Sequence, residues 1–310
     1  MARSVAIIGA GQIGYAAYHA FSSSGFECIL FARTEPEWIG GWKGEFRPYV
    51  LGEDTAPEAD IVLDTIAFDH GDVARYDPDK VGRYIAISSA SVYCDDEGRT
   101  LDEGPVNGYP RFPDSIAEDQ SIVSPGPETY STRKVRMENK AREMFGERAT
   151  ILRPCAIYGA ESRHPRELWF VKRFLDGRRR VPLIYEGQSQ FQTTDAWWLG
   201  DMAVAAAEKE LGGIFNVADQ TAPTVTQIGQ AIAQHMGTVI EIEPIEGTGP
   251  GFVGRTPWSL PLPMRVDASK AVEAIGEPAT NYISQVKMAV DWLTEMNPTD
   301  WRAAFPQLAA

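Results

Sequence analysis

Residues 5–14 read VAIIGAGQIG, a short apolar run followed by glycines in the spacing Gly9-x-Gly11-x-x-Gly14. A helical pattern follows and stops at Gly25, so the order is strand, glycine turn, helix and C-cap. Such glycines let a pyrophosphate approach the helix N-terminus closely, where free N–H groups and the helix dipole favour an anion. The segment therefore predicts dinucleotide binding, against the alternative of an ordinary glycine-rich turn.

Further apolar runs follow along the chain. They occupy residues 26–32, 61–68, 84–88, 149–152 and 214–217, with helical patterns at 133–145 and 199–211 between the later ones. The runs are apolar along nearly their whole length, as are strands of a parallel sheet covered on both faces. Alternating strands and helices predict right-handed crossovers, and hence an α/β fold with a doubly wound parallel sheet of the Rossmann type.

Segments of different composition interrupt this alternation. Residues 94–128 hold five prolines and little periodicity, which predicts a long surface loop. Residues 161–195 and 221–295 are richer in Trp, Pro and Gly, so we expect them to form a smaller substrate-binding lobe over the carboxyl ends of the strands. The Rossmann domain is then expected to span residues 1–160, with residues 196–220 returning to it.

Composition argues against several kinds of partner. With 29 Lys and Arg against 43 Asp and Glu, the net charge of −14 would repel nucleic acid and anionic membranes. No apolar run approaches the length of a membrane span, and only residues 1–4 precede the first apolar run. The three cysteines lack the spacing of zinc ligands. We therefore expect a cytoplasmic protein that binds a small-molecule substrate and no metal.

The end of the second strand bears on which dinucleotide is bound. Dinucleotide folds often place an acid there to bind the ribose 2′-hydroxyl, but this sequence has Ala32-Arg33-Thr34. An acid repels a 2′-phosphate, whereas an arginine attracts it and can stack on adenine. The sequence therefore predicts that NADP(H) is preferred and that NAD(H) is possible, unless Arg33 is merely a solvated loop residue.

Tyr130 and Lys134 are four residues apart at an expected helix start, so the phenol and the ammonium share one helical face. A cation beside a phenol favours the phenolate, which can exchange a proton with an alcohol or carbonyl oxygen. This spacing alone is frequent by chance. Its significance rises because the fourth strand ends in Ser88-Ser89, and a hydroxyl there can hold the same oxygen.

Together these motifs resemble the short-chain dehydrogenase/reductase superfamily, in its extended or atypical NAD-dependent epimerase/dehydratase branch. The resemblance covers most of the chain and includes the glycine turn and residues 88–93, 130–138, 152–159, 215–217 and 266–271. Other segments are similar to bacterial proteins labelled 2′-hydroxyisoflavone reductase-like. The resemblance implies that Tyr130 is the general acid/base, that Lys134 binds the nicotinamide ribose and tunes Tyr130, and that Ser89 orients the reacting oxygen.

The candidate site residues fall into two further groups. Expected cofactor contacts are Gly9, Gly11, Gln12, Ile13, Gly14, Arg33, Thr65, Ile66, Ser88, Lys134 and Pro154. Expected substrate contacts are Ser91, Trp197 and Arg255.

The chain departs from the branch where a substrate would bind. Ile8 replaces the first glycine of the usual Gly-x-x-Gly-x-x-Gly, and Ala156 stands where nucleotide-sugar members carry an asparagine. No Arg or Lys occurs from residue 181 to 207, although a diphosphate needs charge-assisted hydrogen bonds. The aromatic residues of the second lobe favour an apolar or aromatic carbonyl substrate, unless they form the core of that lobe.

Three functions stay open. The first is an NADP(H)-dependent reductase or dehydrogenase that acts on a carbonyl/alcohol pair. The second is an NAD-dependent sugar epimerase or dehydratase with an internal redox cycle, in which Arg255 could contact the diphosphate. The third is a cofactor-binding regulatory protein, which the Ser89, Tyr130 and Lys134 set disfavours. Because the expected helix after Tyr130 is heavily charged, both a monomer and a homodimer remain open.

The substitution Arg33→Asp tests the cofactor preference. We expect the ratio of NADPH affinity to NADH affinity to fall by about tenfold, roughly 1.4 kcal/mol, because a carboxylate repels the 2′-phosphate. Fluorescence titration of both nucleotides measures this ratio. An unchanged ratio would show that Arg33 does not select the cofactor.

Overall fold

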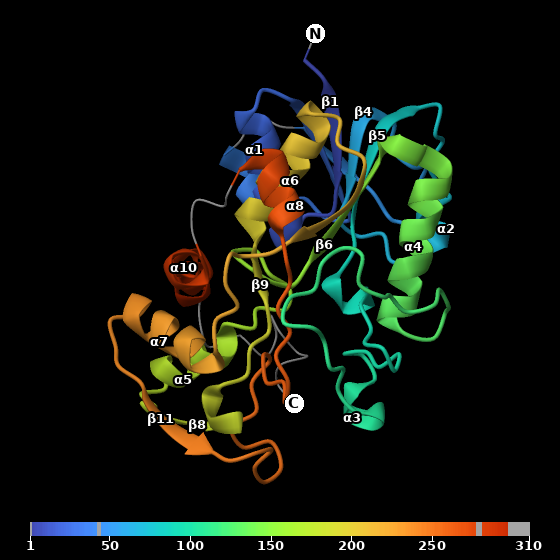
Figure 1. Cartoon of the computed structure of the whole chain (residues 1–310). Coiled ribbons are helices and arrows are strands. Elements are labelled where there is room, and N and C mark those ends of the chain that lie inside the picture. The colour runs from blue at the N-terminus through green and yellow to red at the C-terminus, as the bar shows by residue number, and fades with distance from the viewer. Residues whose placement is uncertain (1, 42–44, 277–280, 297–310) are drawn as a thin grey trace. The chain divides into compact units, whose positions relative to one another are not determined.

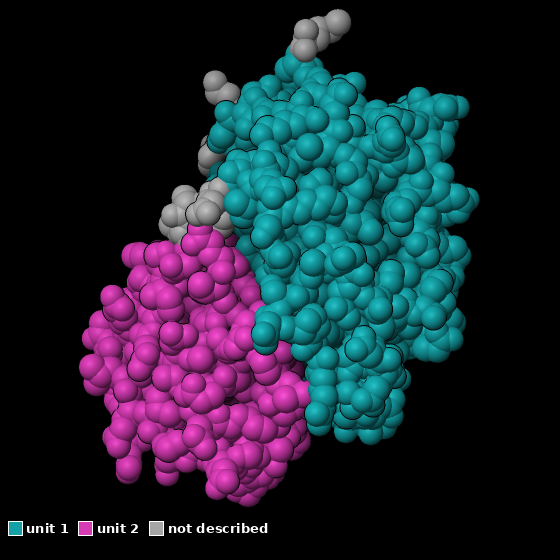
Figure 2. All heavy atoms as spheres, viewed as in Figure 1, with its two compact units in different colours: residues 1–155, 196–218, 266–277 teal, residues 156–195, 219–265, 278–310 magenta. Residues whose placement is uncertain are grey.

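The computed structural model describes residues 2–41, 45–276 and 281–296. The chain divides into two compact units, which are described separately: unit 1 holds residues 1–155, 196–218 and 266–277, and unit 2 holds residues 156–195, 219–265 and 278–310 (Figure 2).

Residues 266–276 lie in unit 1, whereas the sequence places them in the second lobe. The reason is pairing with unit 1. Val266 forms a β-bridge with Ile116, and Asn216 Nδ2 donates to the carbonyl of Asp267 at 3.0 Å. Residues 277–280 of the predicted lobe lie outside the described residues.

Unit 1 is built on a seven-stranded parallel sheet in the order β10-β6-β5-β4-β1-β2-β3 (Figure 1). Its strands are β1 (Ser4–Ile8), β2 (Glu27–Ala32), β3 (Glu45–Pro48), β4 (Ala59–Asp64), β5 (Val81–Ile87), β6 (Ala149–Pro154) and β10 (Gly213–Val217). The chain runs outward from β1 through β2 to β3 and then returns to β4 on the other side of β1. This order confirms the predicted doubly wound fold and puts its switch point between β1 and β4.

Helices cover both faces of this sheet (Figure 1). One face carries α1 (Gln12–Ser23), α6 (Ala196–Glu208) and α8 (Ser269–Ile275), and the other carries α2 (His70–Val73) and α4 (Tyr130–Phe145). Gly200 favours the close packing of α1 on α6, because a Cβ there would lie only 3.1 Å from the backbone of Ala16. Between the sheet and α4, buried residues such as Val62, Tyr84 and Met137 form a core.

Two strands differ from the sequence prediction. The apolar run at residues 61–68 ends as a strand at Asp64, because Asp64 Oδ1 accepts from the N–H groups of Ile66 and Ala67 and turns the chain. The edge strand β3 is not predicted at all. It is four residues long and mostly exposed, so it carries no apolar signal.

The predicted loop at residues 94–128 is irregular apart from the short helix α3 (Gly104–Asn107). Buried Asp95 organises its first part by accepting from the backbone N–H groups of Glu97, Arg99 and Arg111. These bonds and the Arg99 guanidinium hold the pKa of the Asp95 carboxyl at about 2, despite the opposing effect of burial. The loop is therefore an ordered part of unit 1.

Unit 2 contains two small parallel sheets and a helical layer. The sheets pair β7 (Ala156–Tyr158) with β9 (Thr193–Asp195) and β8 (Arg180–Ile184) with β11 (Glu241–Ile245). The helices are α5 (Leu168–Leu175), α7 (Val225–His235), α9 (Tyr282–Gln285) and α10 (Lys287–Glu295). Phe170 and Trp258 are buried in the core of this unit, so these two aromatic residues serve packing, whereas Phe252 is 87% exposed.

Short 3-10 turns complete the two units. They are η1 (Glu37–Gly41), η2 (Ala90–Val92), η3 (Gly146–Arg148) and η4 (Tyr185–Gly187). Across the described ranges, the helices are all too short or too polar to span a membrane.

Candidate functional site

The glycine turn between β1 and α1 is packed so closely that side chains are excluded. Gly9 has a φ of +108°, and a Cβ there would lie 2.4 Å from Thr65 Oγ1. A Cβ on Gly14 would lie 1.8 Å from the carbonyl oxygen of Gly9. Gly11 is the N-cap of α1, and no described side chain caps this helix start. The turn thus leaves the first N–H groups of α1 open to an anion at the switch point.

The turn after β4 forms the other side of the switch point. Thr65 donates from both its backbone N–H and its hydroxyl to the carbonyl of Ile8, at 3.1 and 2.6 Å. Ile66 is 39% exposed, and a Cβ on Gly9 would lie 2.7 Å from its Cγ2. The predicted cofactor residues Gly9, Gly14, Thr65 and Ile66 are therefore brought together.

Other predicted cofactor residues lie at the same end of the sheet. Gln12 opens α1, and its Oε1 is buried without a hydrogen-bond partner among the described residues. Arg33 follows the last residue of β2 and is exposed. Pro154 ends β6, is buried and pairs with Val217. Of these, Gln12 and Arg33 have polar groups available for a ligand.

Tyr130 is the first residue of α4. The helix starts there because the preceding Thr129 accepts from the N–H of Thr132, and Thr132 Oγ1 accepts in return from the N–H of Thr129. Tyr130 is 41% exposed, and its ring centre lies 5.5 Å from that of Phe68. One helical turn later, Lys134 Nζ lies 5.8 Å from the centre of the Tyr130 ring. The predicted pair thus shares one face, with the phenol accessible.

The ammonium of Lys134 is buried between two backbone carbonyls. Lys134 is 5% exposed, and its Nζ donates to the carbonyl oxygens of Ala67 at 2.6 Å and Ile87 at 2.8 Å. Burial lowers the pKa of Lys134 to about 8, although the carboxylates of Asp64, Glu138 and Asp72 oppose this shift. Because an ammonium has three N–H groups, the two carbonyls leave one for a ligand.

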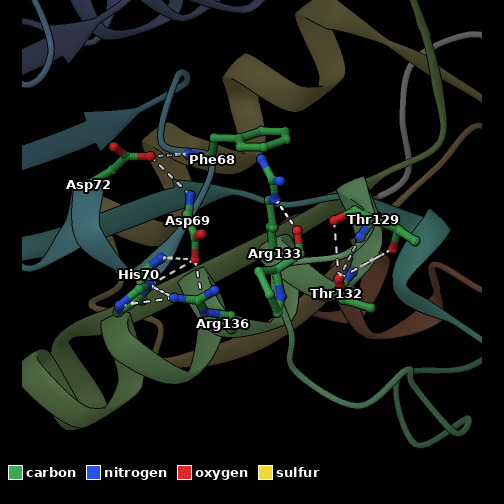
Figure 3. Close-up of polar contacts among 9 residues, drawn as sticks. Phe68, Asp69, His70, Asp72, Thr129, Thr132, Arg133 and Arg136 are labelled. Atoms are coloured by element: carbon green, nitrogen blue, oxygen red, sulfur yellow. Dashed lines mark hydrogen bonds and ion pairs between the residues drawn. The ribbon is translucent and has the colours of Figure 1, made fainter.

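Polar contacts fasten the segment after Ala67 to α4 (Figure 3). Asp72 Oδ2 accepts from the backbone N–H groups of Phe68 and Asp69, at 2.7 and 2.9 Å. Asp69 Oδ1 pairs with Arg136 Nε on α4 at 3.2 Å, and the guanidinium of Arg133 lies over the Phe68 ring. These contacts position the backbone segment whose Ala67 carbonyl accepts from Lys134 Nζ.

The three serines after β5 have different partners. Ser88 Oγ donates to Glu138 Oε1 at 2.5 Å and is buried, so its hydroxyl is already used. Ser91 accepts from the hydroxyl of Ser131 at its carbonyl (2.8 Å) and at its Oγ (3.0 Å), which ties η2 to α4. Ser89 Oγ accepts from the N–H of Ser91, so its own proton remains to be donated to a ligand.

A buried ion pair joins α4 to β6. The Arg153 guanidinium binds both carboxylate oxygens of Glu138, at 2.9 and 2.6 Å, and both side chains are at most 2% exposed. The guanidinium also lies 4.9 Å from the centre of the Tyr93 ring, and the Tyr93 hydroxyl donates to Asn216 Oδ1 at 2.6 Å. This cluster fixes α4 against β6, which carries Arg153, and extends through Tyr93 to Asn216 on β10.

The remaining predicted substrate residues are Trp197 and Arg255. Trp197, on α6, packs on α1, where its ring centre lies 6.1 Å from that of Tyr15 and 5.3 Å from that of His19. This is the sheet face opposite α4, and packing accounts for the ring. Arg255 belongs to unit 2, where it lies over the exposed Phe252 ring at 6.0 Å. The structure therefore does not bring Trp197 to Tyr130.

Sequence reasoning missed two carboxylates that shape the site. Asp64 is fully buried at the end of β4. Asp102, in the long loop, accepts from the N–H of Ser131 at 2.8 Å, directly beside Tyr130. The signal for Asp64 is an acid inside an apolar run, but Asp102 lies in a loop without a motif. In the parts of the chain that the structure describes, no group of three or more His, Cys, Asp or Glu residues is placed to hold a metal ion.

Over nearly its whole length, the chain has the fold of NAD-dependent epimerases and dehydratases. No family model matches the sequence, and no curated protein sequence matches it either. Among solved structures, the Bordetella bronchiseptica enzyme WbmH in complex with NAD⁺ has a TM-score of 0.73 at 15% identity, covering 96% of this chain and 100% of that one.

Two Bacillus enzymes are also similar. The UDP-glucuronic acid 4-epimerase of Bacillus cereus, in complex with NAD, has a TM-score of 0.70 at 14% identity, covering 95% of this chain and 97% of that one. The dTDP-glucose 4,6-dehydratase of Bacillus anthracis, also in complex with NAD, has a TM-score of 0.68 at 16% identity, covering 98% and 100%. At these identities the likeness shows the fold, which confirms the fold that the sequence resemblance implies.

The substitution Glu138→Ala tests the buried ion pair. It removes the partner of a buried guanidinium, so we expect the free energy of unfolding to fall by about 3–5 kcal/mol. Urea denaturation measures this loss. The matched control is Glu143→Ala, because Glu143 lies on the same helix and forms an exposed pair with Lys140. A similar loss in both variants would show that burial of the pair does not matter.

Proposed function

We propose that the protein is a nicotinamide dinucleotide-dependent oxidoreductase that acts on a carbon bearing a hydroxyl or carbonyl group. The observation that carries this proposal is the buried ammonium of Lys134, 5.8 Å from the centre of the accessible Tyr130 ring. A cation beside a phenol stabilises the phenolate, which makes tyrosine a competent proton-transfer group near neutral pH.

The glycine turn fits the pyrophosphate of such a cofactor. The open N-terminus of α1 supplies N–H groups, and the absence of a Cβ at Gly9 lets the turn pack closely against Thr65 and Ile66. The unpartnered Gln12 Oε1 at the same helix start can accept a hydrogen bond from a hydroxyl group of the dinucleotide. We propose that these residues hold the dinucleotide and that the remaining N–H of Lys134 binds its ribose. A nicotinamide bound there would supply hydride transfer to or from the substrate carbon.

The residues of the chain then divide the proton chemistry between them. Tyr130 gives its hydroxyl proton to the substrate oxygen during reduction and accepts it during oxidation. Ser89 donates a hydrogen bond to the same oxygen and so orients it. Lys134 supplies the positive charge that favours the phenolate. The Glu138–Arg153 pair has no part in proton transfer but fixes the helix that carries Tyr130 and Lys134.

Two forms of this chemistry have support, and we favour an epimerase or dehydratase that closes its redox cycle on a bound NAD. Its support is the similarity of nearly the whole chain to a dTDP-glucose 4,6-dehydratase and a UDP-glucuronic acid 4-epimerase, each in complex with NAD. An NADP(H)-dependent reductase of an apolar or aromatic carbonyl compound is the second candidate. Its support is Arg33, exposed after β2, where it can reach a 2′-phosphate.

The substitution Tyr130→Phe tests the shared chemistry. We expect turnover to fall by a factor of about 10² to 10⁴, because the proton-transfer group is lost. Dinucleotide affinity should change little, since the phenyl ring remains. Steady-state kinetics and nucleotide titration measure the two effects. The control Tyr18→Phe also removes a single hydroxyl, from a buried residue of α1, and should leave turnover unchanged. Unimpaired turnover in Tyr130→Phe would contradict the proposal.

The state of the purified protein separates the two forms. The epimerase or dehydratase form predicts that NAD is retained through purification and that UDP- or dTDP-sugars turn over without added nucleotide. The reductase form predicts exchangeable NADPH and stoichiometric NADPH oxidation by a carbonyl substrate. Absorbance at 340 nm, together with analysis of nucleotides released on denaturation, distinguishes these outcomes.

A further inference from the structure

Asp64 is a buried carboxylate at the switch point of the sheet that the chemistry above does not use. It is 0% exposed and is the last residue of β4. Its Oδ1 accepts from the N–H groups of Ile66 at 3.0 Å and Ala67 at 2.7 Å, and its Oδ2 accepts from the hydroxyls of Tyr76 at 2.9 Å and Tyr84 at 3.0 Å. An ionised carboxylate accepts and never donates, so four donors match that state.

The residue that Asp64 holds is the one that binds Lys134. Ala67 donates its N–H to Asp64 Oδ1, while its carbonyl oxygen accepts from Lys134 Nζ at 2.6 Å. A single residue therefore links the carboxylate to the ammonium. The other carbonyl on Nζ, that of Ile87, ends strand β5 and is fixed by the sheet. Of the two carbonyls, only the one from the turn depends on a side chain for its position.

The charges around Lys134 make Asp64 different from the other two nearby carboxylates. Lys134 faces Asp64 on β4, Asp72 on α2, and Glu138 and Tyr130 on its own helix. Glu138 is already paired with Arg153, which offsets its charge. Asp72 is bonded to the backbone at the start of α2.

Asp64, in contrast, is bonded to neutral groups. Around it lie Tyr49 after β3, Tyr76 after α2 and Tyr84 on β5, none of which carries a positive charge. Burial raises the pKa of the Asp64 carboxyl above its usual value, and its four hydrogen bonds offset only part of that rise. The four donors on its two oxygens favour the ionised form, whose negative charge acts on the ammonium of Lys134.

We propose that Asp64 is a positioning residue for Lys134: it fixes the Ala67 carbonyl on Nζ and supplies the negative charge that keeps the amine protonated. Its consequence for turnover rests on the proposed function, but its effect on the ionisation of Lys134 does not. Asp64 touches neither substrate nor cofactor in this role. It acts through Lys134 on Tyr130.

The substitution Asp64→Asn tests this role while keeping the shape of the side chain. The amide oxygen can still accept from Ile66 and Ala67, and the amide nitrogen can donate to the tyrosine oxygens, so the turn is kept and the charge is lost. The titration of Lys134 is followed by NMR of ¹³C-labelled lysine, with Lys134→Met assigning the signal. We expect the midpoint to fall by about one pH unit, a tenfold loss of proton affinity, because the ammonium loses an opposite charge.

The matched control is Asp60→Asn, on the same strand. Asp60 is exposed and bonded to Ser4, so its loss should leave the Lys134 midpoint in place. In the active enzyme, the alkaline limb of the pH–rate profile should move to lower pH in Asp64→Asn by the same amount as the NMR midpoint. A folded Asp64→Asn protein whose Lys134 midpoint does not fall would overturn the inference.

The unsubstituted protein gives an independent test that does not depend on whether the variant folds. The ¹³Cγ shift of Asp64 should be that of a carboxylate at pH 7, and it should change again as Lys134 loses its proton. An Asp64 that is protonated at pH 7 would overturn the inference. A lowered Lys134 midpoint in a protein without dinucleotide-dependent turnover would support the inference and contradict the proposed function.

Discussion

The site in unit 1 depends on solvating one buried cation with backbone oxygen. An ammonium removed from water is strongly unfavourable unless its N–H groups find acceptors. Lys134 finds two, in the carbonyls of Ala67 and Ile87, at the ends of the β4 turn and of β5. The turn, the end of the strand and the helix must therefore meet within hydrogen-bond distance of one atom. Two sets of contacts keep these three elements together. The segment after Ala67 is bonded to α4, and a buried ion pair joins α4 to β6.

Most of the sheet could be predicted from the sequence because its inner strands are buried on both faces and read as apolar runs. The exceptions have physical causes. Strand β3 lies at the edge and is mostly exposed, so polar residues are tolerated there. Strand β4 ends inside an apolar run, because the buried carboxylate of Asp64 accepts from the N–H groups of Ile66 and Ala67 and turns the chain.

The site was predictable where side chains carry its chemistry and was not where the backbone does. The spacing of four residues predicts that Tyr130 and Lys134 lie on one helical face. The glycines of the first turn predict that the backbone there packs closely against its neighbours. Nothing in the sequence identifies Ala67, which contributes a carbonyl from a segment far away in the chain. Trp197 shows why an aromatic residue is ambiguous in a sequence: it suits a pocket and helix packing equally well, and its ring packs on α1.

The burial of Lys134 also makes the free energy of folding depend on pH. Its pKa is about 8 in the folded protein against an ordinary value of 10.5, so the unfolded chain binds the proton more tightly. Below pH 8 both states carry the charge, and the folded state is disfavoured by this group; as the pH rises from 8 toward 10.5, that penalty disappears. Over this window alkali therefore favours folding, as far as this residue is concerned, while it removes the charge next to Tyr130. The pH range in which Lys134 no longer disfavours folding is therefore not the range in which its charge favours the Tyr130 phenolate.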